Sequence, residues 1–244
     1  MLALPNNQPV PTGTQTKKAI AFVTQRRIIM CIIFSKPAGV AFPSITTLKA
    51  CWERNPHGVG FAVATGKHVY IRKGFMTWNE FAATDFDGLE DHACVFHFRY
   101  ATHGSVSPGN CHPFPIVGNL KRTDATVDVA VAHNGIIAGQ QTSKKDYSDT
   151  MCYIENVIAP YWKQCKGKGK MYTSAKRRAN LLAETGSKWS FLYSDGTIVN
   201  IGDGIECNGV WYSNAGFRTY TASKPVVIRY PEAMCRPLPM AGYF

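Results

Sequence analysis

Residues that could take part in chemistry fall at four separated places in this chain. Cys31 follows a methionine, Arg99 lies in a run of alternating residues, and Asn134 precedes a glycine. Asp149 opens an amphipathic stretch. A thiolate is a strong nucleophile, and the free α-amino group of a first residue can take the thiol proton near neutrality. Because a methionine before a small residue is typical of a translation start, Cys31 is a candidate nucleophile that supplies its own base.

Each of these residues also has a purely structural interpretation. A lone cysteine in an apolar run is typical of a small hydrophobic residue in a buried strand. The pair Asn134-Gly135 is a common tight hairpin turn. Ser148 or Asp149 suits the N-cap of a helix, and a cap role of Asp149 is compatible with binding a substrate as well.

Four histidines raise the question of a metal site: His97, His103, His112 and His133. No carboxylate or cysteine partner falls at a diagnostic spacing from them. We therefore expect neither a metal nor a cofactor.

The elements that must position these residues follow from periodicity. We expect strands at 31–34, 92–101, 127–133 and 209–213, hairpins at 60–73 and 190–201, and helices at 45–54, 77–83 and 149–162. The helix near residue 77 begins with the capping box of Thr77 and Glu80. Strands at both ends of one core with helices between them indicate a layered α+β domain rather than a doubly wound sheet.

Composition limits the class of protein. The 244 residues suffice for one domain, and no apolar run reaches the length of about 18 residues that would span a membrane. The dispersed cysteines indicate reduced thiols and a cytoplasmic protein. The net charge of +11 is high, and a basic segment at 163–178 is either a solvated surface or a face that meets nucleic acid or an acidic partner.

Residues 1–30 differ in composition from the rest of the chain. Residues 1 to about 18 are polar and contain proline, so they cannot bury enough apolar surface to fold alone. We expect 1–30 to be a disordered extension that is removed or not translated, and 31–244 to be the working domain.

Several motifs occur together in a recognisable order. The segments are Met30-Cys31-Ile32-Ile33, Phe98-Arg99-Tyr100-Ala101-Thr102-His103-Gly104, Asn110-Cys111-His112-Pro113-Phe114, Ala132-His133-Asn134-Gly135-Ile136-Ile137, Ser148-Asp149-Thr150 and Phe191-Leu192-Tyr193-Ser194-Asp195-Gly196. Together they resemble the glutaminase domain of the class II glutamine amidotransferases, which are N-terminal-nucleophile hydrolases. The resemblance extends over most of the chain from Cys31 onward.

The resemblance implies a four-layer αββα sandwich and a set of site residues. Cys31 would be the nucleophile, and Asn134 and Gly135 would supply the oxyanion hole. Arg99 would bind the α-carboxylate of glutamine and Asp149 its α-ammonium group, with Thr102 and His103 lining the pocket. The implied reaction is hydrolysis of L-glutamine to L-glutamate and ammonia through a thioester.

Some features depart from the family pattern. Met151 replaces a common glutamate, Tyr100 replaces a tryptophan, and the short segment at 140–145 suggests a more open pocket. No second catalytic domain fits after the first, so ammonia would be released or passed to a separate synthetase. Two alternatives stay open: a silent glutamine- or partner-binding domain if 1–30 stay attached, and an amidase with another acyl substrate.

Overall fold

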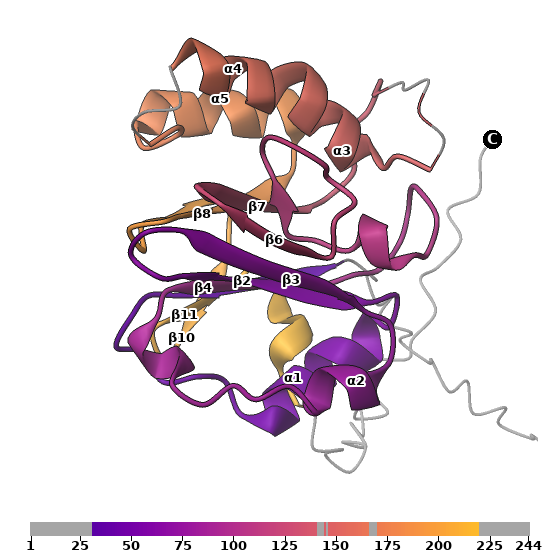
Figure 1. Ribbon diagram of the computed structural model, residues 1–244, viewed down its shortest axis with the longest axis vertical. Helices are drawn as coiled ribbons and strands as arrows, with labels where there is room; N and C mark the ends of the chain where they lie inside the picture. The colour runs from indigo at the N-terminus through magenta and orange to yellow at the C-terminus, as the bar shows by residue number, and fades with distance from the viewer. Residues whose placement is uncertain (1–30, 141–143, 145, 166–169, 220–244) are drawn as a thin grey trace, which may run out of the picture.

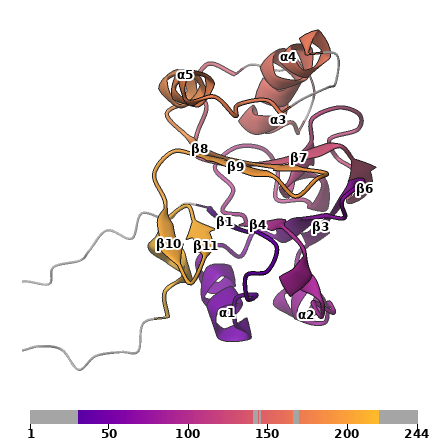
Figure 2. The ribbon, with the colours of Figure 1, turned by 90° about the vertical axis from the view of Figure 1, so that its left-hand side faces the viewer.

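Two antiparallel sheets lie face to face, and helices cover the outer side of each (Figure 1). This computed structural model describes residues 31–140, 144, 146–165 and 170–219. The view in Figure 2 shows the same four layers edge-on, helix, sheet, sheet, helix. The αββα architecture implied by the motifs is therefore confirmed. The expected extension at 1–30 lies outside the described residues.

The sheets differ in size. The larger has the order β10-β11-β1-β4-β2-β3-β6 and the smaller β5-β7-β8-β9. The larger sheet consists of β1 (Ile32–Lys36), β2 (Val59–Ala64), β3 (Val69–Phe75), β4 (Cys94–Phe98), β6 (Asp124–Val127), β10 (Ile205–Cys207) and β11 (Val210–Tyr212). The smaller consists of β5 (Phe114–Pro115), β7 (Val129–Asn134), β8 (Lys188–Tyr193) and β9 (Ile198–Ile201).

The helices form the two outer layers. Beneath the larger sheet lie α1 (Ile45–Arg54) and α2 (Trp78–Ala82), and over the smaller lie α3 (Asp149–Tyr153), the π-helical segment η3 (Ile154–Ile158), α4 (Ala159–Gln164) and α5 (Ala175–Thr185). Short 3-10 turns are η1 (Leu89–Asp91), η2 (Pro108–Asn110) and η4 (Ala215–Phe217). The helix expected at 149–162 is thus present as α3, η3 and α4 in succession, and the capping box that opens α2 is present.

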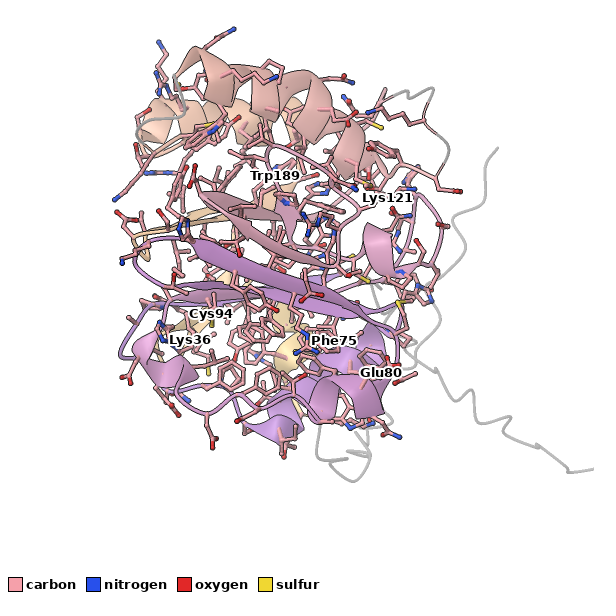
Figure 3. All side chains as sticks on the ribbon, in the orientation of Figure 1. Lys36, Phe75, Glu80, Cys94, Lys121 and Trp189 are labelled. Atoms are coloured by element: carbon pink, nitrogen blue, oxygen red, sulfur yellow. The ribbon has the colours of Figure 1, made fainter. Side chains whose placement is uncertain are left out.

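Alternation along the strands sorts side chains into separate cores. On β4, Phe96 and Phe98 face α1 and α2 in an aromatic cluster, whereas Val95 faces the smaller sheet. Figure 3 shows Phe75 and Cys94 on the helix side of the larger sheet and Trp189 between the smaller sheet and its helices. The space between the sheets is lined largely by small aliphatic residues.

One expected strand is wrong. The pattern at 127–133 predicts a single strand, but Val127 ends β6 of the larger sheet and Val129 begins β7 of the smaller one. The chain changes sheets at Asp128. β6 is only partly buried whereas every residue of β7 is buried, but the run of β-branched and small apolar residues continues through the crossing, so the sequence pattern does not reveal it.

The pairing of β1 with β4 brings the predicted site together. The strands are antiparallel, with Ile32 opposite Phe98. The residue before β1 therefore meets the residues after β4. The end of β7 reaches the same edge, since Asn134 hydrogen-bonds to Cys31.

Candidate active site

Cys31 lies directly before β1, with its thiol against the backbone of Tyr100. Its Sγ is 3.2 Å from both the amide nitrogen and the carbonyl oxygen of Tyr100. Burial raises the pKa of the thiol to about 11, although the Tyr100 hydrogen bond and the charge of Arg99 act to lower it. The thiol is therefore protonated near neutral pH and needs a base to become a nucleophile.

Asn134, the last residue of β7, holds the backbone of Cys31. Its Nδ2 donates to the Cys31 carbonyl oxygen at 2.6 Å and to Ser213 Oγ at 2.8 Å. Asn214 Nδ2 donates to the same Cys31 carbonyl at 2.8 Å. Asn134 is buried, and its Oδ1 has no hydrogen-bond partner within the described part of the chain. Both N–H groups of this amide are therefore in use, and the predicted role of Asn134 in an oxyanion hole, which would require a substrate oxygen to replace one of these acceptors, stays a prediction.

Gly135 follows at a position that excludes a side chain. Its φ is 155°, and a Cβ built on it would overlap the Ser187 side chain, at 2.7 Å from Cβ of that residue. Glycine therefore lets the chain end β7 in close contact with Ser187. The predicted use of its N–H in an oxyanion hole stays a prediction.

Arg99 lies one residue beyond β4 and is buried. Its Nη1 donates to the Ser105 carbonyl at 2.8 Å and its Nη2 to the His103 carbonyl at 2.9 Å. The guanidinium thus orders the loop that follows β4. Thr102 and His103 are exposed in that loop, and His103 takes part through its backbone. Substrate binding by these three residues stays a prediction.

Asp149 begins α3, but it is not the helix cap. Ser148 fills that position, since its side chain accepts from the Met151 N–H. The Asp149 carboxylate accepts from the Ile137 N–H at 2.8 Å and from its neighbour, the Thr150 N–H, at 2.8 Å. Two backbone donors therefore fix its orientation, and the cap role that the sequence offered to either residue belongs to Ser148.

The charged groups lie near the thiol. Both the positive charge of Arg99 and the negative charge of Asp149 shift the pKa of Cys31, in opposite directions. The structure thus brings together Cys31, Arg99, Asn134 and Asp149. It also adds Ser213 and Asn214, which sequence reasoning missed because they follow a short strand without a motif of their own.

The histidines do not share one environment. His103 is exposed, whereas His97, His112 and His133 are buried close together, with 4.2 Å between the ring centroids of His97 and His112. Burial lowers the pKa of all three. Among the described residues, no group of three or more His, Cys, Asp or Glu side chains is placed to hold a metal ion.

Two surface cavities lie away from the thiol. One, of about 630 Å³, is lined by residues of α1 with Trp78 and Thr219, and the other, of about 280 Å³, lies between the helices over the smaller sheet. Neither is lined by a predicted site residue. The open pocket expected from the short segment at 140–145 stays a prediction, because most of that segment lies outside the described residues.

The basic segment is mostly solvated where the structure describes it. Lys163, Lys176 and Arg177 are exposed, and Lys170 pairs with Asp195 at 2.7 Å. The remainder of the segment, 166–169, lies outside the described residues. In the part of the chain that is described, no helix has both the length and the apolar character needed to cross a membrane.

The chain has sequence relatives of one kind among known proteins. All are glutamine–fructose-6-phosphate aminotransferases (isomerizing). That of Pseudomonas putida is 34% identical over 105 residues, covering 42% of this chain and 16% of the relative. That of Pyrococcus horikoshii is 31% identical over 100 residues, with coverage of 41% and 15%. That of Chlamydia muridarum is 28% identical over 95 residues, with coverage of 39% and 14%.

A solved structure and the family models complete the comparison. A glutamine phosphoribosylpyrophosphate amidotransferase from B. subtilis, complexed with ADP and GMP, is 19% identical, with a TM-score of 0.36, over 75% of this chain and 41% of that one. No protein-family model matches the chain. The resemblance to class II glutamine amidotransferases is confirmed by the sequence relatives. The chain spans only 14% to 16% of these relatives' length, so its own reaction is a proposal.

Proposed function

We propose that this protein hydrolyses the side-chain amide of L-glutamine, with Cys31 as the nucleophile at the start of the working chain. The α-amine takes the thiol proton, and the thiolate attacks the amide carbon to give a tetrahedral oxyanion. The C–N bond then breaks, ammonia leaves with the proton from the α-ammonium group, and a glutamyl thioester remains. Water hydrolyses the thioester to glutamate and regenerates the thiol.

The contact between Asn134 and Cys31 is the observation that carries the proposal. The two residues lie 103 positions apart in sequence, yet the Asn134 side-chain amide is 2.6 Å from the Cys31 carbonyl. The Asn134 amide thus lies at the backbone of the attacking residue, and in the reaction one of its N–H groups would turn from its present acceptor to the substrate oxyanion. Such a donor accelerates acyl transfer by about a hundredfold or more.

Arg99 and Asp149 support glutamine as the substrate. They carry opposite charges and both act on the Cys31 thiol. A free amino acid carries an α-carboxylate and an α-ammonium group, so one positive and one negative side chain beside the nucleophile suit it. Thr102 and His103 would line the pocket from the loop that Arg99 orders.

The alternatives predict different behaviour of the same site. If 1–30 stay attached, the nitrogen of Cys31 is an amide without basicity, and the domain binds glutamine or a partner without turnover. If the acyl substrate is another one, Arg99 and Asp149 have no part in selecting it. A separate synthetase would consume the ammonia, and no cofactor takes part in the hydrolysis itself.

The test is a comparison of amides with protein that begins at Cys31. We expect ammonia release from glutamine well above that from asparagine or simple amides, and a mass increase on Cys31 after reaction with an electrophilic glutamine analogue. Arg99→Ala should abolish the preference for glutamine. If that variant and its parent treat all amides alike, glutamine is not the substrate.

A further inference from the structure

His133 lies between the predicted oxyanion donor and the predicted α-ammonium site. It is buried on β7, directly before Asn134. Its Nδ1 is 2.8 Å from the Thr150 hydroxyl in the first turn of α3, beside Asp149. One side chain therefore joins the two segments that would hold glutamine.

The protonation state of His133 follows from its partners. Burial lowers the pKa of the ring, so it is neutral near pH 7. Its Nε2 has no hydrogen-bond partner among the described residues. A buried N–H without an acceptor is rarer in proteins than a bare acceptor, so the proton belongs on Nδ1. His133 therefore donates to the Thr150 hydroxyl.

Thr150 transmits this contact to Asp149. Its N–H donates to Asp149 Oδ1 at 2.8 Å, and its hydroxyl, which accepts from His133, lies 3.5 Å from the same oxygen. Since an accepting hydroxyl still has its own proton to offer, that proton can point toward the carboxylate. The rotamer of Thr150 and the orientation of Asp149 are thus set together.

Packing keeps the His133 ring in place. It lies against Trp189, with ring centroids 4.4 Å apart, and Figure 3 shows Trp189 between the smaller sheet and the helices. The His133 carbonyl is 3.1 Å from His97 Nε2 on β4, two residues before Arg99. A carbonyl can only accept, so His97 donates and ties the two sheets at this point.

We propose that His133 is a positioning residue whose Nδ1–H fixes Thr150, so that Asp149 faces the α-ammonium group of the substrate. This inference rests on the proposed function in one respect, the use of Asp149 to recognise glutamine. It assigns His133 and Thr150 to substrate selection. Neither residue touches the reacting atoms.

The experiment compares glutamine with 4-carbamoylbutanoate, which lacks the α-amino group. His133→Leu and Thr150→Val should each lower the preference for glutamine about tenfold, measured as the ratio of kcat/KM values. Both variants should leave kcat/KM for 4-carbamoylbutanoate close to that of the parent. The double variant should be no worse than either single one, since both changes break the same contact.

Conservative variants separate positioning from a general loss of structure. His133→Asn keeps an N–H near the Nδ1 position and Thr150→Ser keeps the hydroxyl, so both should retain most of the preference. His112→Leu removes a neighbouring buried ring whose nitrogens have no hydrogen-bond partner among the described residues, and it should leave the ratio unchanged. Equal losses on both substrates in the Leu and Val variants would overturn the inference and leave the proposed function intact.

A second measurement does not depend on turnover. Nitrogen NMR of the imidazoles should show His133 neutral at pH 7 with the proton on Nδ1, and Thr150→Val should disturb that signal. A proton on Nε2 in the parent overturns the inference even if the protein hydrolyses no glutamine. Absence of hydrolysis by the parent counts against the proposed function alone.

Discussion

Two asparagines of the smaller sheet reach across to the larger one, and they differ in what they leave unused. Asn200 on β9 bonds Ser35 and Ser190 with both its oxygen and its nitrogen. Asn134 donates to Ser213 and to the Cys31 carbonyl, and its buried Oδ1 has no partner within the described residues. Asn200 thus has partners for both polar atoms of its side chain and links the two sheets. Asn134 uses both its N–H groups and leaves a buried acceptor oxygen unpaired next to the candidate nucleophile's segment, so only Asn134 of the two has an unsatisfied polar atom.

The largest effect should come from the Cys31 thiol, which lies near Asn134 and has no counterpart near Asn200. Cys31→Ala removes the nucleophile, and we expect glutamine hydrolysis to fall about a thousandfold or more, as it does when other covalent enzymes lose theirs. Ammonia release measures this. Cys207→Ala, at a partly buried thiol on β10, should leave the rate unchanged. Comparable losses of hydrolysis in both variants would contradict the assignment of Cys31 as the nucleophile.

The paired asparagine variants test the comparison itself. Asn134→Ala should lower kcat about a hundredfold to a thousandfold, because an oxyanion donor is lost. Asn200→Ala should leave kcat unchanged and lower the free energy of unfolding by about 1–3 kcal/mol, because buried serine hydroxyls lose partners. Steady-state kinetics and urea unfolding separate the two. Equal kcat losses would mean that both asparagines act through the fold.

A smaller effect is expected at the carboxylate beside the thiol. Asp149→Asn removes the charge and keeps only one of the two backbone hydrogen bonds, because the amide NH2 takes the place of one of the two accepting oxygens. The value of kcat/KM for glutamine should fall roughly tenfold to a hundredfold, since a charge-assisted contact is lost. Asp195→Asn removes a carboxylate paired with Lys170 on the surface and serves as the control. An unchanged kcat/KM in Asp149→Asn would exclude its contact with the α-ammonium group.

The smallest effect concerns the glycine after Asn134. Gly135→Ala should lower the free energy of unfolding by about 1–3 kcal/mol, because its Cβ overlaps the Ser187 side chain. Adding Ser187→Gly removes the overlap and should restore part of the loss. Thermal or urea unfolding gives the comparison. If Ser187→Gly restores none of the lost free energy of unfolding, contact with Ser187 does not explain why position 135 requires glycine.

Many helices and hairpins of the fold could be predicted, because the signals that specify them lie within a few neighbouring residues. The helix at Ile45–Arg54, the capping box of Thr77 and Glu80, and the hairpin joining β8 to β9 follow from periodicity, caps and turn residues within a few positions. The change of sheet at Asp128 could not be predicted, because the run of β-branched and small apolar residues continues through the crossing.

The site was accessible to prediction only as a set of motifs. Cys31, Arg99, Asn134 and Asp149 carry recognisable neighbours, and the register of β1 on β4 explains why distant segments meet. The contacts of Asn214 with Cys31 and of His133 with Thr150 join residues through packing. No spacing in the sequence encodes such contacts, so they required the structure.

The most direct test of the account is whether hydrolysis requires a free α-amino group on Cys31. Protein that begins at Cys31 and protein with one extra alanine before it should be compared across pH 6 to 10. With a free amine, kcat/KM should rise with pH through about 7.7 to 8.0, since only the deprotonated amine can take the thiol proton. With the extra residue there is no amine base, and burial holds the thiol pKa at about 11, so hydrolysis near neutral pH should be lost. Equal rates of glutamine hydrolysis by the two proteins near pH 7 would contradict the account.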